Sequence, residues 1–249
     1  MAQQILPGKL VAATVDHQLR SESADEAQLV AKICHDLGVP HIILTPEAKI
    51  AGNLQSSARA ARYALLERAA DAQNCPHIGT AHHADDQLET LLMRLARGSG
   101  VDGLSGIRAR NGRVVRPLLE FTKAELIEIC SSVGIQSVND PSNANIDFDR
   151  VAMRRWLAST QHPFPANRAL RSASALADAS DALAWMTDNL AAQRIRQEND
   201  VIICNASDLP SELKRRLLIR CLRSMDANLA PRGEAIDRLL TDLENARTA

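Results

Sequence analysis

The sequence predicts an α/β protein with a parallel sheet in its first half and a helical second half. Three apolar, β-branched segments have the character of buried strands, at residues 9–17, 41–45 and 77–82. Amphipathic or Ala/Leu-rich helical segments follow them, at residues 23–38, 54–73 and 85–98. This alternation predicts βαβ units, in which helices join parallel strands of one doubly wound sheet.

The predicted helix ends agree with this interpretation. Ser23 and Glu26 have the spacing of a capping box, and Gly38 follows the last turn of the same segment. Residues 114–119 predict another short strand, and Thr122 with Glu125 predicts the capped start of a helix over residues 122–134. From about residue 150 the pattern is helical, apart from the apolar run 201–204.

Two prolines in the segment 158–166, ASTQHPFPA, interrupt the helical pattern of the second half. Proline restricts both its own backbone and that of the preceding residue, so helices end at such segments. We therefore expect a catalytic α/β domain over residues 1–157 and a smaller helical domain over residues 158–249.

Composition narrows the function classes. The chain contains 29 basic and 30 acidic residues, so only local charge clusters can indicate a charged partner. Aromatic residues make up 2% of the sequence, which argues against a base-stacking sheet of the RNA-recognition-motif type. The five cysteines form no CxxC pair, which argues against a zinc knuckle or a disulfide framework. The sequence lacks a segment apolar enough to span a membrane, and we expect a cytoplasmic protein.

Histidines and carboxylates gather after the third predicted strand, in TAHHADDQLET. Ligands of doubly wound sheets bind beyond the carboxyl ends of the strands, where His82 and His83 are expected. Asp85, Asp86 and Glu89 can share one face of the next helix. Helix capping explains one or two of these acids but not the whole group. The HExxH spacing of zinc enzymes is absent, and oxygen ligands favour Mg²⁺ at Asp85 and Asp86.

The first predicted strand ends in a similar way, with Asp16, His17 and Arg20. We expect these side chains to lie on the same rim of the sheet as His82. Arg59 and Arg62 are three residues apart on the helix 54–73, a spacing that suits phosphate binding. A turn-capping role for Asp16 and a solvated helix face for the two arginines are the alternatives.

Several motifs together resemble one enzyme family. VDHQLR, GTAHHADDQLETLLMRLARGSG, GLSGI, VVRPLLEFTKAEL and NDPSNANIDFDRVAMR occur in the order found in bacterial tRNA(Ile)-lysidine synthetases. The resemblance covers residues 9–157. It implies a Rossmann-like fold of the adenine nucleotide alpha hydrolase type, in the N-type ATP pyrophosphatase family.

The resemblance implies a reaction. ATP would adenylate C2 of the wobble cytidine in a tRNA(Ile) with a CAU anticodon, and the amine of free L-lysine would then displace AMP to form lysidine. By position, the catalytic residues would be His82, Asp86, Glu89 and Arg62. The residues that bind ATP or substrate would be Asp16, His17, Arg20, Arg59 and Asp85. Mg²⁺ would offset the charge of pyrophosphate.

Two basic stretches flank the proposed site. Residues 94–119 contain six arginines and a single acid, Asp102, and residues 150–177 contain five arginines and no acid. We expect five of these side chains to track a tRNA backbone: Arg97, Arg116, Arg150, Arg154 and Arg155. Ordinary solvated helix faces are the alternative. The sequence leaves open whether the chain acts as a homodimer.

The chain departs from the family pattern at the glycine-rich loop SGGxDS, which the 249 residues do not contain. The family places this loop after a strand in the middle of the sheet. Without that strand, we expect segments 9–17 and 41–45 to be separated from segment 77–82. Translation from an internal Met is the simplest interpretation, and a real loss is the alternative. Gln18 and Val151 stand where the family usually has Gly and Asn.

Three other functions remain as alternatives. A tRNA thiolase shares the fold, but many thiolases use paired cysteines that this chain lacks. A metal-dependent phosphoesterase would use the histidine and aspartate motifs without a glycine-rich loop. An inactive, truncated tRNA-binding remnant would keep only the basic stretches. Release of AMP that requires both lysine and the CAU tRNA distinguishes the ligase from all three.

Overall fold

A computed structural model describes residues 2–18, 23–46, 54–135, 149–159, 161–229, 231 and 233–246. The chain forms two compact units, the first comprising Met1–Thr80 and Arg110–Arg116 and the second comprising Ala81–Ala109 and Pro117–Ala249. This division rests on contacts between residues and not on function. The boundary expected between the catalytic and the helical domain, between residues 157 and 158, stays a prediction.

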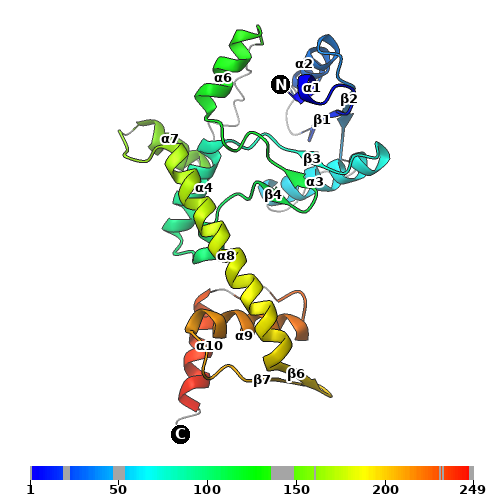
Figure 1. Ribbon diagram of the computed structural model, residues 1–249. Helices are drawn as coiled ribbons and strands as arrows, with labels where there is room; N and C mark the ends of the chain where they lie inside the picture. The colour runs from blue at the N-terminus through cyan, green and yellow to red at the C-terminus, as the bar shows by residue number, and fades with distance from the viewer. Residues whose placement is uncertain are drawn as a thin grey trace. The chain divides into compact units, whose positions relative to one another are not determined.

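The first unit contains the predicted alternation of strands and helices (Figure 1). Its elements are α1 (Ala2–Ile5), β1 (Ala12–Val15), α2 (Ser23–Asp36), β2 (His41–Leu44), α3 (Leu54–Ala72), β3 (Ile78–Gly79), β4 (Arg110–Asn111) and β5 (Val114–Val115). Strands β1 and β2 pair in parallel, from Ala12 opposite His41 to Val15 opposite Leu44. The predicted parallel α/β fold is therefore confirmed, although β3 and β5 are shorter than the apolar runs suggested.

The strands of the first unit belong to two separate ladders. Strand β3 pairs in parallel with β5, and β4 pairs with β5 in the antiparallel direction. Among the described residues no hydrogen-bonded ladder joins β1–β2 to β3–β5–β4. Helix α3 contacts both β1 and β3. The separation expected for a sheet without its middle strand is present.

The second unit is mainly helical. It contains α4 (Ala84–Ala96), α5 (Val101–Leu104), α6 (Lys123–Ser132), α7 (Asp149–Ser159), α8 (Ala166–Arg194), β6 (Ile195–Glu198), β7 (Val201–Cys204), α9 (Ser211–Met225) and α10 (Gly233–Ala246). The long helix α8 packs against α4, α5 and α9 (Figure 1). The predicted capping box is present, since Glu125 N donates to Thr122 Oγ1 at 3.3 Å and Thr122 N donates to Glu125 Oε2 at 2.7 Å.

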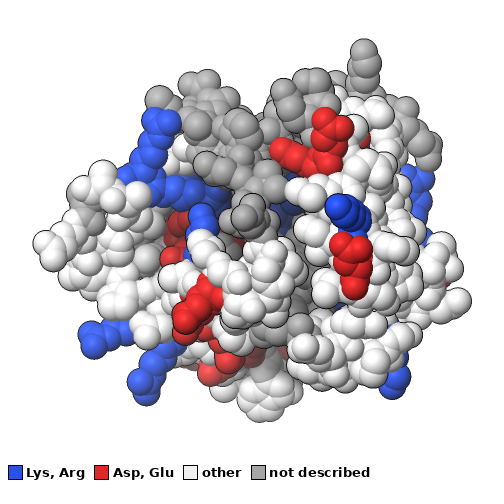
Figure 2. Space-filling model, turned by 90° about the horizontal axis from the view of Figure 1, so that it is seen from above, with Lys and Arg blue, Asp and Glu red and all other residues white. Residues whose placement is uncertain are grey.

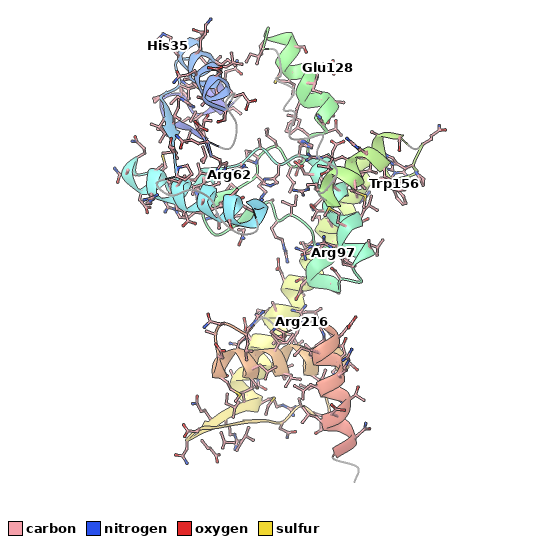
Figure 3. All side chains as sticks on the ribbon, turned by 180° about the vertical axis from the view of Figure 1, so that it is seen from behind. His35, Arg62, Arg97, Glu128, Trp156 and Arg216 are labelled. Carbon is pink, nitrogen blue, oxygen red and sulfur yellow. The ribbon has the colours of Figure 1, made fainter. Side chains whose placement is uncertain are left out.

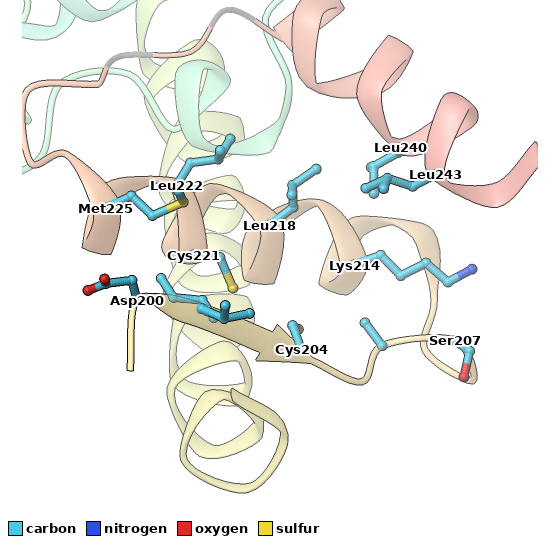
Figure 4. A pocket seen from close by; sticks show the side chains of 13 residues that line it. Asp200, Cys204, Ser207, Lys214, Leu218, Cys221, Leu222, Met225, Leu240 and Leu243 are labelled. Atoms are coloured by element: carbon cyan, nitrogen blue, oxygen red, sulfur yellow. The ribbon is translucent and has the colours of Figure 1, made fainter. Parts of the chain in front are cut away.

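The C-terminal part of the second unit encloses an apolar cavity of about 500 Å³ between β7, α9 and α10 (Figure 4). Cys204 and Cys221 both line this cavity. Burial and the neighbouring Cys204 raise the pKa of the Cys221 thiol to about 11. All five cysteines are free, and Cys34 is buried as well. The cysteines therefore form no disulfide framework, as predicted.

Candidate functional site

The first turn of α4 holds the predicted carboxylates in place. Asp86 Oδ2 accepts a hydrogen bond from the backbone N–H of His83 at 3.1 Å, which caps the helix. Asp85 Oδ2 accepts from the backbone N–H of Lys123 at 2.7 Å and so links the starts of α4 and α6. Asp86 and Glu89 are buried, at 8% and 4% exposure. Two predicted catalytic carboxylates thus lie on the buried face of one helix.

Arginines from α7 meet these carboxylates. Arg154 Nε donates to Glu89 Oε1 at 2.7 Å, and Arg154 Nη2 donates to Asp86 Oδ1 at 3.2 Å. Arg150 Nε lies 3.3 Å from Glu89 Oε2, and its Nη2 donates to Thr90 Oγ1 at 2.8 Å. We call His83, Asp85, Asp86, Glu89, Arg150 and Arg154 the α4–α7 cluster.

Charge in the α4–α7 cluster is unbalanced. Asp86 and Glu89 contact the two guanidinium groups, whereas the third carboxylate, Asp85, contacts His83, so the cluster carries one net negative charge only when His83 is neutral. Burial raises the pKa of Glu89, although Arg154 opposes this shift. The contact between His83 and Asp85, 3.5 Å between Nδ1 and Oδ2, raises the pKa of His83 and lowers that of Asp85. The cluster can therefore accept one further cation without an excess of positive charge.

Sequence analysis missed the structural role of Gln87. This side chain is 2% exposed, accepts a hydrogen bond from Ile107 N at 2.6 Å and donates to Ile107 O at 3.3 Å. Gly106 has a φ of +66°, and an added Cβ would lie 2.5 Å from Gln87 Oε1. The second glycine of the GLSGI motif, Gly106, therefore allows the loop to approach α4 closely. In the sequence, the available sign of this role was a glutamine among the three acids of the motif.

A second polar group lies at the end of β1 in the first unit, and we call Asp16, His17 and Arg62 the β1-end cluster. Asp16 is buried, and its Oδ1 accepts from Gln18 N at 2.8 Å, so part of its predicted turn-capping alternative is present. Both ring nitrogens of His17 are buried and have no hydrogen-bond partner among the described residues. Burial, with the charge of Arg62, lowers the pKa of His17. A neutral imidazole whose two nitrogens have no partner in the described part of the chain fits a polar ligand.

The remaining predicted ligand-binding residues have different surroundings. Arg62 is exposed on α3 (Figure 3). The guanidinium of Arg59, on the same helix, lies 5.1 Å from the centre of the Tyr63 ring. His82 is half-buried in the second unit, and Arg20 lies outside the described residues. Since the β1-end cluster and His82 belong to different units, their meeting on one rim stays a prediction.

The arginines expected to bind tRNA fall into two groups. Arg150 and Arg154 contact carboxylates of the α4–α7 cluster, whereas Arg97 and Arg155 are exposed and Arg116 is half-buried. On the face shown in Figure 2, basic and acidic side chains are interspersed. A count of the arginines in the two basic stretches therefore overstates the positive charge available to a tRNA. Arg108 and Arg113 also contact acids, at 2.9 Å from Asp181 and 2.6 Å from Asp71.

The predicted magnesium ligands do not form a metal cage. Among the described residues no group of three or more His, Cys, Asp or Glu side chains is arranged to hold a metal ion. Asp85 and Asp86 each accept a hydrogen bond from the backbone, and Asp86 also contacts Arg154. Mg²⁺ bound here would take most of its ligands from phosphates and water.

In the part of the chain that the structure describes, every helix is too short or too polar to cross a membrane.

Comparisons with known proteins identify the family. The model of the ATP-binding PP-loop domain matches residues 2–161. A tRNA(Ile)-lysidine synthase of Zymomonas mobilis is 41% identical over 246 residues, covering 95% of this chain and 74% of that protein. One of Novosphingobium aromaticivorans is 38% identical over 250 residues, covering 98% of this chain and 76% of that protein.

A solved structure supports the fold. A U34-tRNA thiolase from Methanococcus maripaludis, solved with its [4Fe-4S] cluster, aligns with a TM-score of 0.57 and covers 70% of this chain and 63% of that chain. At 16% identity this similarity indicates the fold alone. The family match over more than half of the chain and the close relatives are decisive: this chain belongs to the tRNA(Ile)-lysidine synthase family.

Proposed function

We propose that this chain catalyses the ATP-dependent attachment of lysine to the wobble cytidine of a CAU-anticodon tRNA(Ile). The C2 oxygen of cytidine attacks the α-phosphorus of ATP and pyrophosphate leaves. The ammonium group of lysine loses one proton, the resulting free amine attacks C2 and loses a second proton, and AMP leaves with the former C2 oxygen. The observation that carries the proposal is the α4–α7 cluster, in which the buried carboxylates of Asp86 and Glu89 lie close to Asp85, within the segment that matches the PP-loop family.

In this proposal the α4–α7 cluster receives the ammonium group of lysine. Asp86 and Glu89 are already held at fixed positions by Arg154, so they lose little freedom when the substrate binds. The excess of one carboxylate over the two arginines supplies the charge that an ammonium requires. Asp85 has a lowered pKa because His83 and Lys123 N contact it, so it stays ionised at neutral pH. An individual role for His82 also belongs to this proposal.

The β1-end cluster is proposed to contact ATP. The unsatisfied nitrogens of His17 can bond to the nucleotide, and Arg62 with Arg59 supplies positive charge for its phosphates. Arg20 is assigned to the same role on the resemblance alone. The same hypothesis includes Mg²⁺ bound with the phosphates and tRNA contact by Arg97, Arg116 and Arg155. It also includes the domain boundary at residue 157, cytoplasmic localisation and a homodimer.

The test uses the full chain, ATP labelled at the α-phosphate, lysine and a CAU-anticodon tRNA(Ile) transcript. We expect AMP to appear only when both lysine and this tRNA are present, and mass spectrometry of the tRNA nucleosides to detect lysidine. A methionine tRNA with the same anticodon is the matched control. AMP release without lysine would favour other chemistry on this fold, and tRNA binding without AMP would favour the non-catalytic remnant.

Substitution of Asp86 tests the site itself. Asp86→Asn keeps the shape of the side chain but removes the charge proposed to hold lysine, so we expect the KM for lysine to rise about 30-fold or more. Glu128→Gln, at an exposed position on α6 (Figure 3), is the control and should leave turnover unchanged. Unchanged lysine dependence in Asp86→Asn, with a normal unfolding midpoint, would contradict the assignment.

A further inference from the structure

Three rings form a partly exposed stack where α7 ends. The rings of Trp156 and His162 have centroids 6.3 Å apart and planes 22° apart. The rings of His162 and Phe164 follow with 6.2 Å and 17°. Trp156 is 44% exposed and Phe164 is 42% exposed. The sequence contains only two Trp, one Tyr and three Phe, so this gathering of two of the six in nine residues is a marked local enrichment.

A hollow of about 410 Å³ lies beside this stack, between α4 and α7. Trp156 forms part of its wall, and the other lining residues are Met93, Ala96, Arg97, Ala152 and Met153. The lining is thus apolar and flexible apart from one guanidinium group. A volume in this range suits a small planar ligand or group, and methionine side chains adapt to the shape of what they contact.

Two exposed arginines lie next to Trp156 or the hollow, Arg155 on α7 and Arg97 after α4. Residues 150–177 contain five arginines and no acid, although the whole chain has a net charge of −1. Arg155 is exposed on α7, next to Trp156, and Arg97 is exposed at the end of α4 (Figure 3). A flat aromatic face next to guanidinium groups is the combination that binds unpaired bases together with their phosphates.

We propose that Trp156 and the adjoining hollow bind an unpaired nucleobase of the RNA substrate, with Arg97 and Arg155 contacting its flanking phosphates. This inference rests on the proposed function for the identity of the RNA. It adds a binding subsite outside the α4–α7 cluster, since Trp156, Arg97, Arg155 and the other residues that line the hollow do not belong to that cluster. A protein partner would also use exposed aromatic rings, but the exposed guanidinium groups of Arg97 and Arg155 next to Trp156 favour a polyanion.

The chain offers a direct spectroscopic test, because it contains only two tryptophans. Trp185 is 66% exposed on α8, so Trp185→Phe leaves Trp156 as the single tryptophan with little effect on folding. We expect the emission of Trp156 to be quenched when the CAU-anticodon tRNA(Ile) is added, with the Kd measured by gel shift. A gel shift without any change in Trp156 emission would overturn the subsite and leave the proposed function intact. Absence of any gel shift would count against both.

Affinity provides the second measurement. Base stacking on an aromatic ring corresponds to about a 5- to 150-fold change in Kd, so Trp156→Ala should weaken tRNA binding within that range. Trp156→Phe should restore most of the affinity, and Trp185→Ala should have no effect. If Trp156→Ala binds as tightly as Trp185→Ala, the subsite is wrong.

Salt dependence separates stacking from charge. Stacking releases no counterions, so Trp156→Ala should keep the slope of log Kd against log salt. Arg155→Ala should reduce this slope by about one, as expected for one lost phosphate contact. A reduced slope in Trp156→Ala would instead indicate a general distortion of the basic surface and would contradict the proposal.

Discussion

The β1-end cluster and the α4–α7 cluster differ in whether their buried polar side chains have hydrogen-bond partners among the described residues. His17 has two buried nitrogens without a described partner, whereas Asp86 and Glu89 contact arginines at hydrogen-bond distance. An unsatisfied buried group costs free energy that a ligand can recover, so the first cluster is suited to accept a ligand from outside. The second is organised before any ligand binds. Its substrate would add to an existing charge network.

The most direct way to break this comparison is to remove the arginine of the organised cluster. Arg154→Ala leaves Glu89 buried with only Arg150 beside it, so we expect a loss of about 2–3 kcal/mol in the free energy of unfolding. Partial exposure of Arg154 keeps this figure at the lower end of the range for buried pairs. Urea unfolding measures it. The control is Arg171→Ala at an exposed position of α8, which should change stability by less than about 0.5 kcal/mol.

A glycine pair tests how the loop beside α4 is held. Gly106 and Gly98 have φ values of +66° and +65°, but an added Cβ meets Gln87 only at Gly106. Both alanine substitutions carry the cost of the left-handed backbone, about 1–2 kcal/mol. Gly106→Ala should cost about 1–2 kcal/mol more, because Gln87 must move and lose its bonds to Ile107. Equal midpoints for the two variants would show that the loop is not tightly held.

The pKa values of the two histidines should be shifted in opposite directions from that of a free histidine. The pKa of His83 is raised, chiefly by Asp85, and the pKa of His17 is lowered, chiefly by burial. The stability from His83 contacts is complete below about pH 6.5 and is lost as pH rises through its higher folded pKa. The stability linked to neutral His17 is present above about pH 6.5 and is lost as pH falls through its lower folded pKa.

Ring-proton NMR, with His17→Gln and His83→Gln for assignment, measures both histidine values directly. The comparison between the clusters fails if His83 titrates at a lower pH than His17.

The smallest effect concerns the backbone beside His17. Gln18 has a φ of 53°, a conformation that costs an L-residue about 1–2 kcal/mol, and its N–H donates to Asp16. Gln18→Gly relieves this cost, but glycine loses more backbone entropy than glutamine when the chain folds. We therefore expect the free energy of unfolding to rise by about 0.5–1 kcal/mol. Gln18→Ala keeps the strained backbone and should show no gain. The family glycine at this position thus has a conformational reason.

Local signals accounted for the elements that sequence analysis predicted. The Thr122–Glu125 capping box and the alternation of β1, α2, β2 and α3 depend on residues a few positions apart. The same is true of the carboxylates at the start of α4, which favour a helix N-terminus and share a face by spacing alone. Short elements such as α5, β4 and β6 were missed, because four residues or fewer give little periodicity.

The sequence by itself determined the family, the α/β class and the identity of the acidic motif. Only the tertiary structure paired Glu89 with Arg154, which is 65 positions away, and brought Met93 and Arg97 beside Trp156. It also placed Val151 in the core. Periodicity and capping report interactions within a few residues, whereas charge pairing and stacking depend on the packing of α4 against α7.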